Sequence, residues 1–215
     1  MLVNDDLRYV VKTTARTYDT IAPEYCRKTR QQRFLDWERG YIERLFFSIR
    51  QPAPRLLDVG CGDGRHCRII EELGGSAIGI DRSRKMIAEA RTYYARGHYV
   101  IMDMCALAFR SAWFDGIWAS GSIYHVPKST VGQVVQGFKR IVKRHGVIAV
   151  SFKLGSGEGL EENPRSYRGS PRFFAYYTKN EMEDVFSRAG FSTIASCAYP
   201  EDVYGDGIQQ MWFGR

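Results

Sequence analysis

The sequence lacks the features that mark membrane and secreted proteins. No window approaches the ~18 consecutive apolar residues of a membrane-spanning helix. The N-terminus, MLVNDDLRYV, carries two acidic residues and lacks the apolar stretch of ~7–15 residues that a signal peptide requires. We therefore expect a cytoplasmic protein without a membrane segment.

Cysteine is also sparse. The chain has five cysteines, an odd number at irregular spacing, and no CxxC pair. A disulfide framework uses an even number of cysteines, and a structural zinc site uses closely paired ligands. We expect no metal site and interpret all five cysteines as reduced thiols: Cys26, Cys61, Cys67, Cys105 and Cys197.

The composition indicates one folded domain with a positive net charge. The 215 residues are 44% hydrophobic and 26% charged, which is enough apolar material for a sizeable core. The 31 Lys and Arg outnumber the 24 Asp and Glu, giving a net charge of +7. Such a balance suits an anionic partner, from a carboxylate to RNA, but many proteins are mildly basic.

The first 52 residues are predicted to form a helical unit separate from the rest. Phe34, Trp37, Tyr41 and Leu45 recur at helical spacing. The residues Gln-Pro-Ala-Pro at 51–54 then break the helix. We accordingly divide the chain into residues 1–52 and a main domain at 53–215.

In the main domain, apolar strands alternate with amphipathic helices. This alternation predicts an α/β fold with a doubly wound, mostly parallel sheet, in which ligands bind at the carboxyl ends of the strands. Gly60, Asp81, Asp103 and Ser120 all follow expected strands. The expected strands are 55–59, 77–80, 98–102, 114–119, 146–152, 192–198 and 208–213, and the expected helices are 65–73, 83–95, 131–142 and 178–189.

The segment Asp58–Gly64 (DVGCGDG) predicts a ligand-binding turn. Its glycines permit a tight turn and close approach of a ligand to the backbone, and a helix N-terminus follows. The pattern is GxGxG, with Arg65 where a dinucleotide loop would have its third glycine. A nicotinamide-dependent oxidoreductase is therefore disfavoured, and the turn alone is also compatible with a purely structural role.

Two aspartates at successive strand ends strengthen the ligand interpretation. Asp81, 23 residues after Asp58, can accept both hydroxyls of a ribose. Asp103 can accept from an adenine amino group, with the Met104 N–H facing a ring nitrogen, and Met86 can pack on the adenine face. Each residue also has a structural interpretation. Asp81 could stabilise a helix N-terminus, Asp103 could be a turn residue, and Met86 could be a core residue.

The order of these motifs resembles that of the class I S-adenosylmethionine (SAM)-dependent methyltransferases. The resemblance covers roughly residues 18–213 and rests on the ordered segments LLDVGCGDG, IGIDRSRKM, MDMCALAF, FDGIWASGSIYHVP and HGVIAVSFK. It implies a Rossmann-like seven-stranded sheet with the last strand antiparallel. It also implies SAM as cofactor, contacted by Gly60, Cys61 and Gly62 at the methionine part, by Asp81, Arg82, Met86, Asp103 and Met104 at the adenosine part, and by Ser120 at the amino end.

The N-terminal segment YDTIAPEY at 18–25 resembles the YDxIAxxY lid of many of these enzymes. The resemblance makes residues 1–52 a helical lid. An aromatic ring near the sulfonium favours its positive charge, and Tyr18 and Tyr25 are the candidates. The alternative is that both tyrosines are packing residues.

His125 is the candidate catalytic residue. Methyl transfer requires alignment of the acceptor with the methyl group, and a base where the acceptor carries a proton. His125 follows the fourth strand at the edge of the expected site, and Tyr124 beside it is a second candidate for contact with the substrate. The alternative is a structural histidine.

Residues 154–174 interrupt the core between a strand and a helix. In this fold the position resembles a substrate-capping insertion. Arg165, Arg168 and Arg172 could clamp a carboxylate or phosphate of the substrate. The alternative is a solvated loop with self-paired charges.

The leading hypothesis is methyl transfer to an oxygen or nitrogen of a small metabolite. The arginines of residues 154–174 would suit an anionic acceptor. A tRNA methyltransferase acting on a modified uridine is the second hypothesis, but no RNA-binding module is recognisable. The basic run Lys139, Arg140, Lys143 and Arg144 is interpreted as a solvated helix face. A non-catalytic SAM-binding regulatory or partner subunit is the third.

Overall fold

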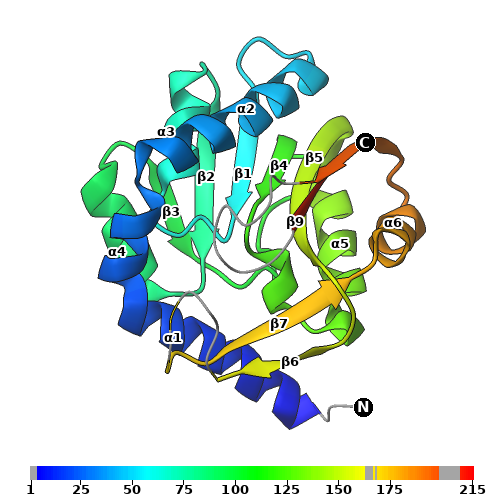
Figure 1. Cartoon of the computed structure of the whole chain (residues 1–215). Coiled ribbons are helices and arrows are strands. Elements are labelled where there is room, and N and C mark those ends of the chain that lie inside the picture. The colour runs from blue at the N-terminus through cyan, green and yellow to red at the C-terminus, as the bar shows by residue number, and fades with distance from the viewer. Residues whose placement is uncertain (1–3, 163–166, 168, 199–208) are drawn as a thin grey trace.

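The computed structural model describes residues 4–162, 167, 169–198 and 209–215, and it shows a twisted sheet between two layers of helices (Figure 1). The strands are β1 Arg55–Val59, β2 Ser76–Asp81, β3 His98–Ile101, β4 Phe114–Ala119, β5 Val142–Leu154, β6 Glu158–Glu161, β7 Arg172–Tyr177, β8 Thr193–Ala198 and β9 Gln209–Gly214. The helices are α1 Asn4–Thr29, α2 Gln32–Ile49, α3 Arg65–Glu72, α4 Arg84–Tyr93, η1 Ile123–His125, α5 Lys128–Ile141 and α6 Lys179–Arg188.

The sheet has the predicted Rossmann-like order. The parallel strands run β3-β2-β1-β4-β5. β9, the last strand of the chain, lies between β5 and β8 and is antiparallel to both. The expected α/β fold with its antiparallel last strand is therefore confirmed.

Alternating side chains of the central strands serve two separate cores, because successive residues of a strand point to opposite faces. Leu57, Ile117 and Ile148 pack with α5 and α6. Their neighbours Leu56, Trp118 and Val147 pack with α2, α3 and α4 on the other face. Figure 1 shows these two helix groups on opposite sides of the sheet.

Most expected boundaries agree with the structure to within a few residues. Ser83 caps α4 as predicted, its hydroxyl accepting from the Met86 N–H at 3.1 Å. The expected N-terminal helical unit consists of two helices with different locations. α2 packs on the sheet through Ile42 and Leu45, whereas α1 crosses the carboxyl end of the sheet (Figure 1).

The segment 154–174, which was predicted to be a substrate-capping insertion, contains strand structure. It contributes an antiparallel hairpin of β6 and β7, and β7 continues the sheet beside the end of β5 through Lys153 and Leu154. Bulky and aromatic residues of β7 (RFFAYY) explain the strand, since such residues favour a half-buried pleated surface. The expected seven-stranded core is present, and the hairpin adds two strands to it.

None of the helices in the described part of the chain is long and apolar enough to cross a membrane.

Candidate active site

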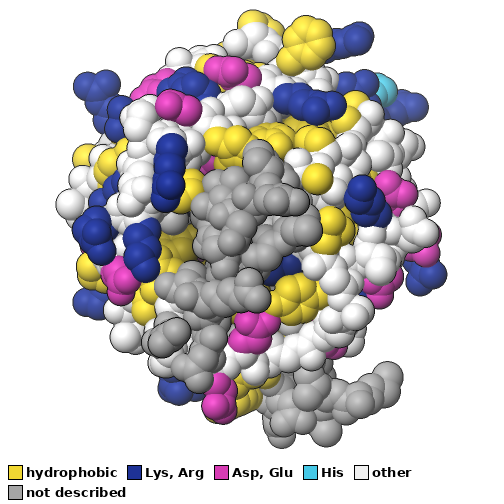
Figure 2. Space-filling view, in the orientation of Figure 1, with side chains coloured by type: hydrophobic (Ala, Val, Ile, Leu, Met, Phe, Trp, Pro, Cys, Tyr) yellow, Lys and Arg dark blue, Asp and Glu magenta, His cyan; other side chains and the backbone are white. Residues whose placement is uncertain are grey.

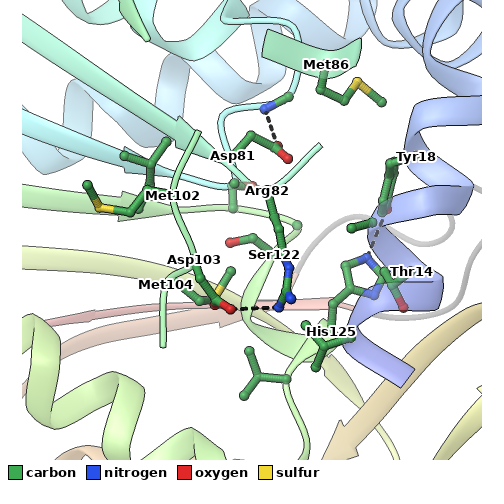
Figure 3. A pocket seen from close by; sticks show the side chains of 18 of the residues that line it. Thr14, Tyr18, Asp81, Arg82, Met86, Met102, Asp103, Met104, Ser122 and His125 are labelled. Carbon is green, nitrogen blue, oxygen red and sulfur yellow. Dashed lines mark hydrogen bonds and ion pairs between the residues drawn. The ribbon is translucent and has the colours of Figure 1, made fainter. Parts of the chain in front are cut away.

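A cavity lies at the carboxyl ends of β1, β2 and β4, under α1. The space between its walls is about 840 Å³ when the open solvent at its mouth is included. The sequence-predicted residues that line it are Tyr18, Tyr25, Gly60, Gly62, Asp81, Arg82, Met86, Asp103, Met104, Ser120 and His125. The structure thus brings together residues that are more than a hundred positions apart in the chain (Figure 3).

The glycine turn forms a cradle that larger residues could not form. Gly60 has a φ of +73°, and a Cβ added to it would lie 2.4 Å from the Cβ of Ser122. The N–H groups of Gly60 and Cys61 both donate to the Ile80 carbonyl, at 2.8 and 2.9 Å. Gly60 and Gly62 line the cavity without side chains, so a ligand can lie directly against the backbone of the turn.

Asp81 is held at the end of β2 by backbone donors. Its carboxylate accepts from the N–H of Gly62 at 3.0 Å and of Ser83 at 2.8 Å. Burial raises the pKa of Asp81 to about 6, although these hydrogen bonds oppose the rise. The side chain lines the cavity, where its oxygens can also accept hydroxyl groups of a ligand.

Asp103 faces Arg82 across the mouth of the cavity. Arg82 Nη1 donates to Asp103 Oδ2 at 2.6 Å, while Asp103 Oδ1 accepts from the Cys105 N–H at 2.9 Å (Figure 3). The two side chains are 42% and 31% exposed, so the pair contributes little to stability. Its effect is to orient the carboxylate, which keeps lone pairs for an amino donor.

Three methionines contribute to the apolar part of the cavity wall. Met86 and Met104 were predicted as ligand contacts, whereas Met102 was not singled out by the sequence analysis. Figure 3 shows Met86 at one side of the cavity and Met102 and Met104 at another. Thioether side chains adapt their shape to flat, polarisable ligands such as a purine base.

α1 is fixed over the cavity at both ends of the site. Asp19 Oδ1 accepts from the Ser83 hydroxyl at 2.6 Å and from the Lys85 N–H at 2.9 Å, at the start of α4. On the other side, the Thr17 hydroxyl donates to the Pro171 carbonyl at 2.6 Å, and the Phe173 N–H donates to Thr14 Oγ1 at 2.9 Å. The helix therefore spans the site from α4 to β7.

His125 is held by hydrogen bonds on both ring nitrogens. The Phe173 carbonyl lies 2.6 Å from Nδ1, and because a carbonyl only accepts, Nδ1 carries the proton. Nε2 then accepts from the Tyr18 hydroxyl at 2.9 Å, and Arg172 Nη1 donates to the same hydroxyl oxygen at 3.3 Å. Burial, with a smaller effect of the charges of Arg172 and Lys153, lowers the pKa of His125 to about 3, although the hydrogen bond to the Phe173 carbonyl opposes the change. The imidazole is therefore neutral at physiological pH.

A network of ion pairs surrounds the residues that follow the glycine turn. Arg65 makes a bidentate pair with Glu38 of α2, with both N–O distances 2.9 Å. It also contacts Asp63, which binds Arg30, the residue after the end of α1, at 2.9 Å. Burial would raise the pKa of Glu38, but Arg65 and His66 outweigh it and hold the pKa below its usual range. Glu38 and Asp63 were not predicted from the sequence, because the contacts Glu38–Arg65 and Asp63–Arg30 join segments that are distant in the chain.

Other predicted site residues lie elsewhere. The side chain of Cys61 packs in the core against α3 and β2 rather than lining the cavity. Tyr124 and Arg172 are buried one side chain behind the cavity wall, in contact with His125 and Tyr18 respectively. Arg165 and Arg168 fall outside the described residues, so their proposed contact with substrate stays a prediction.

Comparison with known proteins identifies the class of molecule. Residues 57–150 match the family described as "Methyltransferase domain". A malonyl-[acyl-carrier protein] O-methyltransferase of Enterobacter lignolyticus is 32% identical over 182 residues, which are 82% of this chain and 68% of that protein. A ubiquinone biosynthesis O-methyltransferase of Nitrobacter winogradskyi is 28% identical over 71% of this chain and 62% of its own length.

Structures of low sequence identity share the fold. A 1,6-didemethyltoxoflavin-N1-methyltransferase of Burkholderia thailandensis, solved with bound 1,6-didemethyltoxoflavin and S-adenosylhomocysteine (SAH), superposes with a TM-score of 0.77 at 15% identity. The match covers 100% of this chain and 91% of that chain. The chain belongs to the SAM-dependent methyltransferase family, as its resemblance to the class I enzymes predicted. It is an enzyme that transfers methyl groups, and its cofactor is SAM.

Proposed function

We propose that the enzyme transfers the methyl group of SAM to a small metabolite, at an oxygen or nitrogen atom. The observation that carries this proposal is a cavity that joins the glycine turn and two strand-end aspartates to Tyr18 and His125. Two relatives whose names specify O-methyltransferases favour oxygen over nitrogen.

The cradle at Gly60 and the neighbouring groups fit SAM. We assign the methionine part to Gly60, Gly62 and Ser120, which line the cavity. A Cβ at Gly60 would collide with Ser122, another lining residue, so this wall of the cavity requires glycine. We assign the ribose to Asp81, the adenine to the surroundings of Asp103, and the sulfonium to the rings of Tyr18 and Tyr25. When bound, SAM supplies an activated methyl group, so the protein's contribution is alignment and exclusion of water.

On the acceptor side, Tyr18 and His125 act as a hydrogen-bonded pair. The neutral imidazole holds the Tyr18 hydroxyl, and α1 closes the cavity above both side chains. We propose that α1 is the lid of the site, because it contacts α4 on the cofactor side and β7 on the acceptor side. A covered cavity of this kind favours a small acceptor over a polynucleotide.

The surface charges also favour a small acceptor. On the face shown in Figure 2, Lys and Arg side chains are interspersed with Asp and Glu side chains. The basic run of α5 and β5 is engaged within the fold: Lys139 donates to the Gly190 carbonyl and Lys143 to Asp115, both at 2.6 Å. Such charges are less available to a phosphate backbone.

The test is transfer of labelled methyl groups from SAM into fractions of a cell extract. We expect label in the small-molecule fraction, and none in it when SAH competes with SAM. Label confined to tRNA or protein would contradict the proposal. Calorimetric titration with SAH and with NAD provides the control for the cofactor, since binding of NAD without SAH would contradict the assignment of the glycine turn.

A further inference from the structure

Asp58 and His66 lie at the two ends of the glycine turn and face one another inside the protein. Asp58 belongs to β1, two residues before Gly60, and His66 belongs to α3, two residues after Gly64. Their side chains are 0% and 2% exposed, and His66 Nδ1 lies 3.9 Å from Asp58 Oδ2. On the other side of the ring, His66 Nε2 lies 2.9 Å from Glu38 Oε1. The imidazole therefore lies between two buried acidic side chains.

Asp58 lacks the contacts that stabilise a buried carboxylate. Apart from His66, the Cys67 thiol donates to Oδ2 at 3.5 Å, and no donor in the described part of the chain hydrogen-bonds to Oδ1. An isolated buried charge is so costly that such a group takes up a proton instead. Burial accordingly raises the pKa of Asp58 to about 6, although the charge of His66 and the hydrogen bond from Cys67 oppose the rise. Either a proton on Asp58 or a charge on His66 is needed to compensate this carboxylate.

The other ionisable groups that surround Asp58 in the described chain do not compensate its charge. Arg65 donates to both carboxylate oxygens of Glu38, each at 2.9 Å, so its charge is matched by that of Glu38. Asp81, on the neighbouring strand β2, would repel a negative charge on Asp58. Burial raises the pKa of the remaining titratable neighbours and keeps them neutral: Cys61, Cys67 and Tyr99. A second proton on His66 is then the charge that can balance an ionised Asp58.

The shape of the glycine turn depends on what holds its two ends. Gly60, Gly62 and Gly64 have φ angles of +73°, +54° and +76°. Glycine loses more backbone freedom on folding than any other residue, so three of them make this segment costly to fix in one conformation. Asp58 and His66 flank all three glycines. An attraction between these two side chains fixes the end of β1 relative to the start of α3, and with it the cradle for the ligand.

We propose that Asp58 and His66 share one proton at neutral pH and that this proton holds the two ends of the glycine turn together. His66 is then a positioning residue for the methionine part of SAM, and the inference rests on the assignment of that part to the turn. With the proton on Asp58, a neutral carboxyl group faces Nδ1; with the proton on His66, an imidazolium faces a carboxylate. In both forms the pair has no net charge, and the proton belongs to the pair rather than to one residue.

The first test is Asp58→Asn. The amide has the shape of the protonated carboxyl group, has no charge and can direct an N–H toward His66 Nδ1. We expect SAH affinity within about threefold of the wild type, because the variant reproduces the neutral form of the pair. A loss of more than about tenfold would mean that the turn requires a negative charge at this position, which would overturn the proposal.

The second test is His66→Gln, which leaves Asp58 without the group that shares its proton. Burial still raises the pKa of Asp58, and the opposing charge of His66 is absent. Asp58 is therefore protonated at about pH 5.5 and forced to ionise as the pH rises to about 8. Relative to the wild type at the same pH, we expect SAH affinity within about threefold at the lower pH and at least about tenfold weaker at the higher pH. An equal loss at both pH values would indicate a packing role alone and would overturn the proposal.

The double variant Asp58→Asn/His66→Gln provides the rescue. It removes the carboxylate that His66→Gln leaves uncompensated, so SAH affinity relative to the wild type should recover at about pH 8 and no longer differ between the two pH values. If His66→Gln does not fold at the higher pH, the double variant should still fold and bind SAH. Failure of the double variant to restore binding would contradict the shared proton. The matched control is His145→Gln, an exposed histidine whose replacement should alter SAH affinity at neither pH.

The wild-type protein separates this inference from the assignments on which it rests. Failure of the wild type to bind SAH would contradict the assignment of the glycine turn to the cofactor. Normal SAH binding by the wild type, together with a loss in His66→Gln that is independent of pH, would overturn the shared proton and leave that assignment intact. The transfer of labelled methyl groups tests the acceptor independently of both.

Discussion

Substitution of Gly60 by alanine tests the glycine turn directly. At its φ of +73°, an L-residue with a side chain is destabilised by about 1–2 kcal/mol. The added Cβ would lie 2.4 Å from the Cβ of Ser122, whereas carbon atoms pack at about 3.5–4.0 Å. Displacing a packed neighbour by more than an ångström costs about 1–3 kcal/mol in addition.

The expected result of Gly60→Ala is a loss of stability of about 2–5 kcal/mol and a loss of SAH affinity of at least about tenfold. Ser122 leads directly into η1, so its displacement also disturbs His125. Thermal unfolding measures the first effect, at roughly 2–4 °C per kcal/mol for a chain of this length, and calorimetric titration with SAH measures the second.

Two variants control this experiment. Gly40→Ala lies in the interior of α2, where a Cβ would meet nothing within 4 Å, and should stabilise the protein by about 0.5–1 kcal/mol. Adding Ser122→Gly to Gly60→Ala removes the contacting atom and should restore part of the stability and affinity, because only the strain in φ remains. If Gly60→Ala retains wild-type stability and SAH affinity, the argument from the cradle is wrong.

Three further predictions follow from the site. Only the ionised carboxylate of Asp81 can accept from two hydroxyls, and burial raises the pKa of Asp81 to about 6. SAH affinity should therefore rise between about pH 5 and about pH 7. Asp81→Asn should bind SAH weakly and with no dependence on pH in this range, and a pH dependence equal to that of the wild type would remove Asp81 from the ribose site. Tyr18→Phe should raise the pKa of His125 only slightly, because burial is the main cause of its low value, and NMR titration measures this change. The variant should lower turnover more than it lowers SAH affinity, because it removes the hydroxyl that contacts His125. Equal losses of turnover and of SAH affinity would indicate that Tyr18 has a packing role alone. Glu38→Gln leaves Arg65 without its bidentate partner and should destabilise the protein by about 3–5 kcal/mol in chemical unfolding, whereas a change below about 1 kcal/mol would mean that water or Asp63 compensates.

The fold could be predicted because its signals are local. Each parallel strand is a short apolar run, and the residues that follow it (Gly60, Asp81, Asp103 and Ser120) are brought to one edge by a general rule of sheet topology. That these residues line one cavity could therefore be predicted from the order of the motifs. Its glycines and aspartates are the residue types that the backbone geometry and the hydroxyl groups of a ligand require.

The acceptor side could not be predicted in the same way. Lys153 is the next-to-last residue of β5, after the apolar run VIAVSF, and nothing in that run indicates that its ammonium is buried against Phe174. The β6–β7 hairpin was hidden by a segment rich in glycine and charge, whose pairing depends on the end of β5. The tautomer of His125 likewise depends on the Phe173 carbonyl, 48 residues away in the sequence. These are tertiary contacts, and sequence periodicity contains no information on them.

Adjacent residues of α1 connect the two sides of the site. Side chains of consecutive residues diverge by about 100° around a helix, so Tyr18 and Asp19 face different neighbours. Tyr18 donates to His125 on the acceptor side, while Asp19 accepts from Ser83, two residues after Asp81, on the cofactor side. A movement of α1 that releases Asp19 from α4 must also move the Tyr18 hydroxyl relative to His125. Because one helix carries both contacts, we expect the position of the Tyr18 hydroxyl in the proposed acceptor site to depend on the contact between α1 and α4.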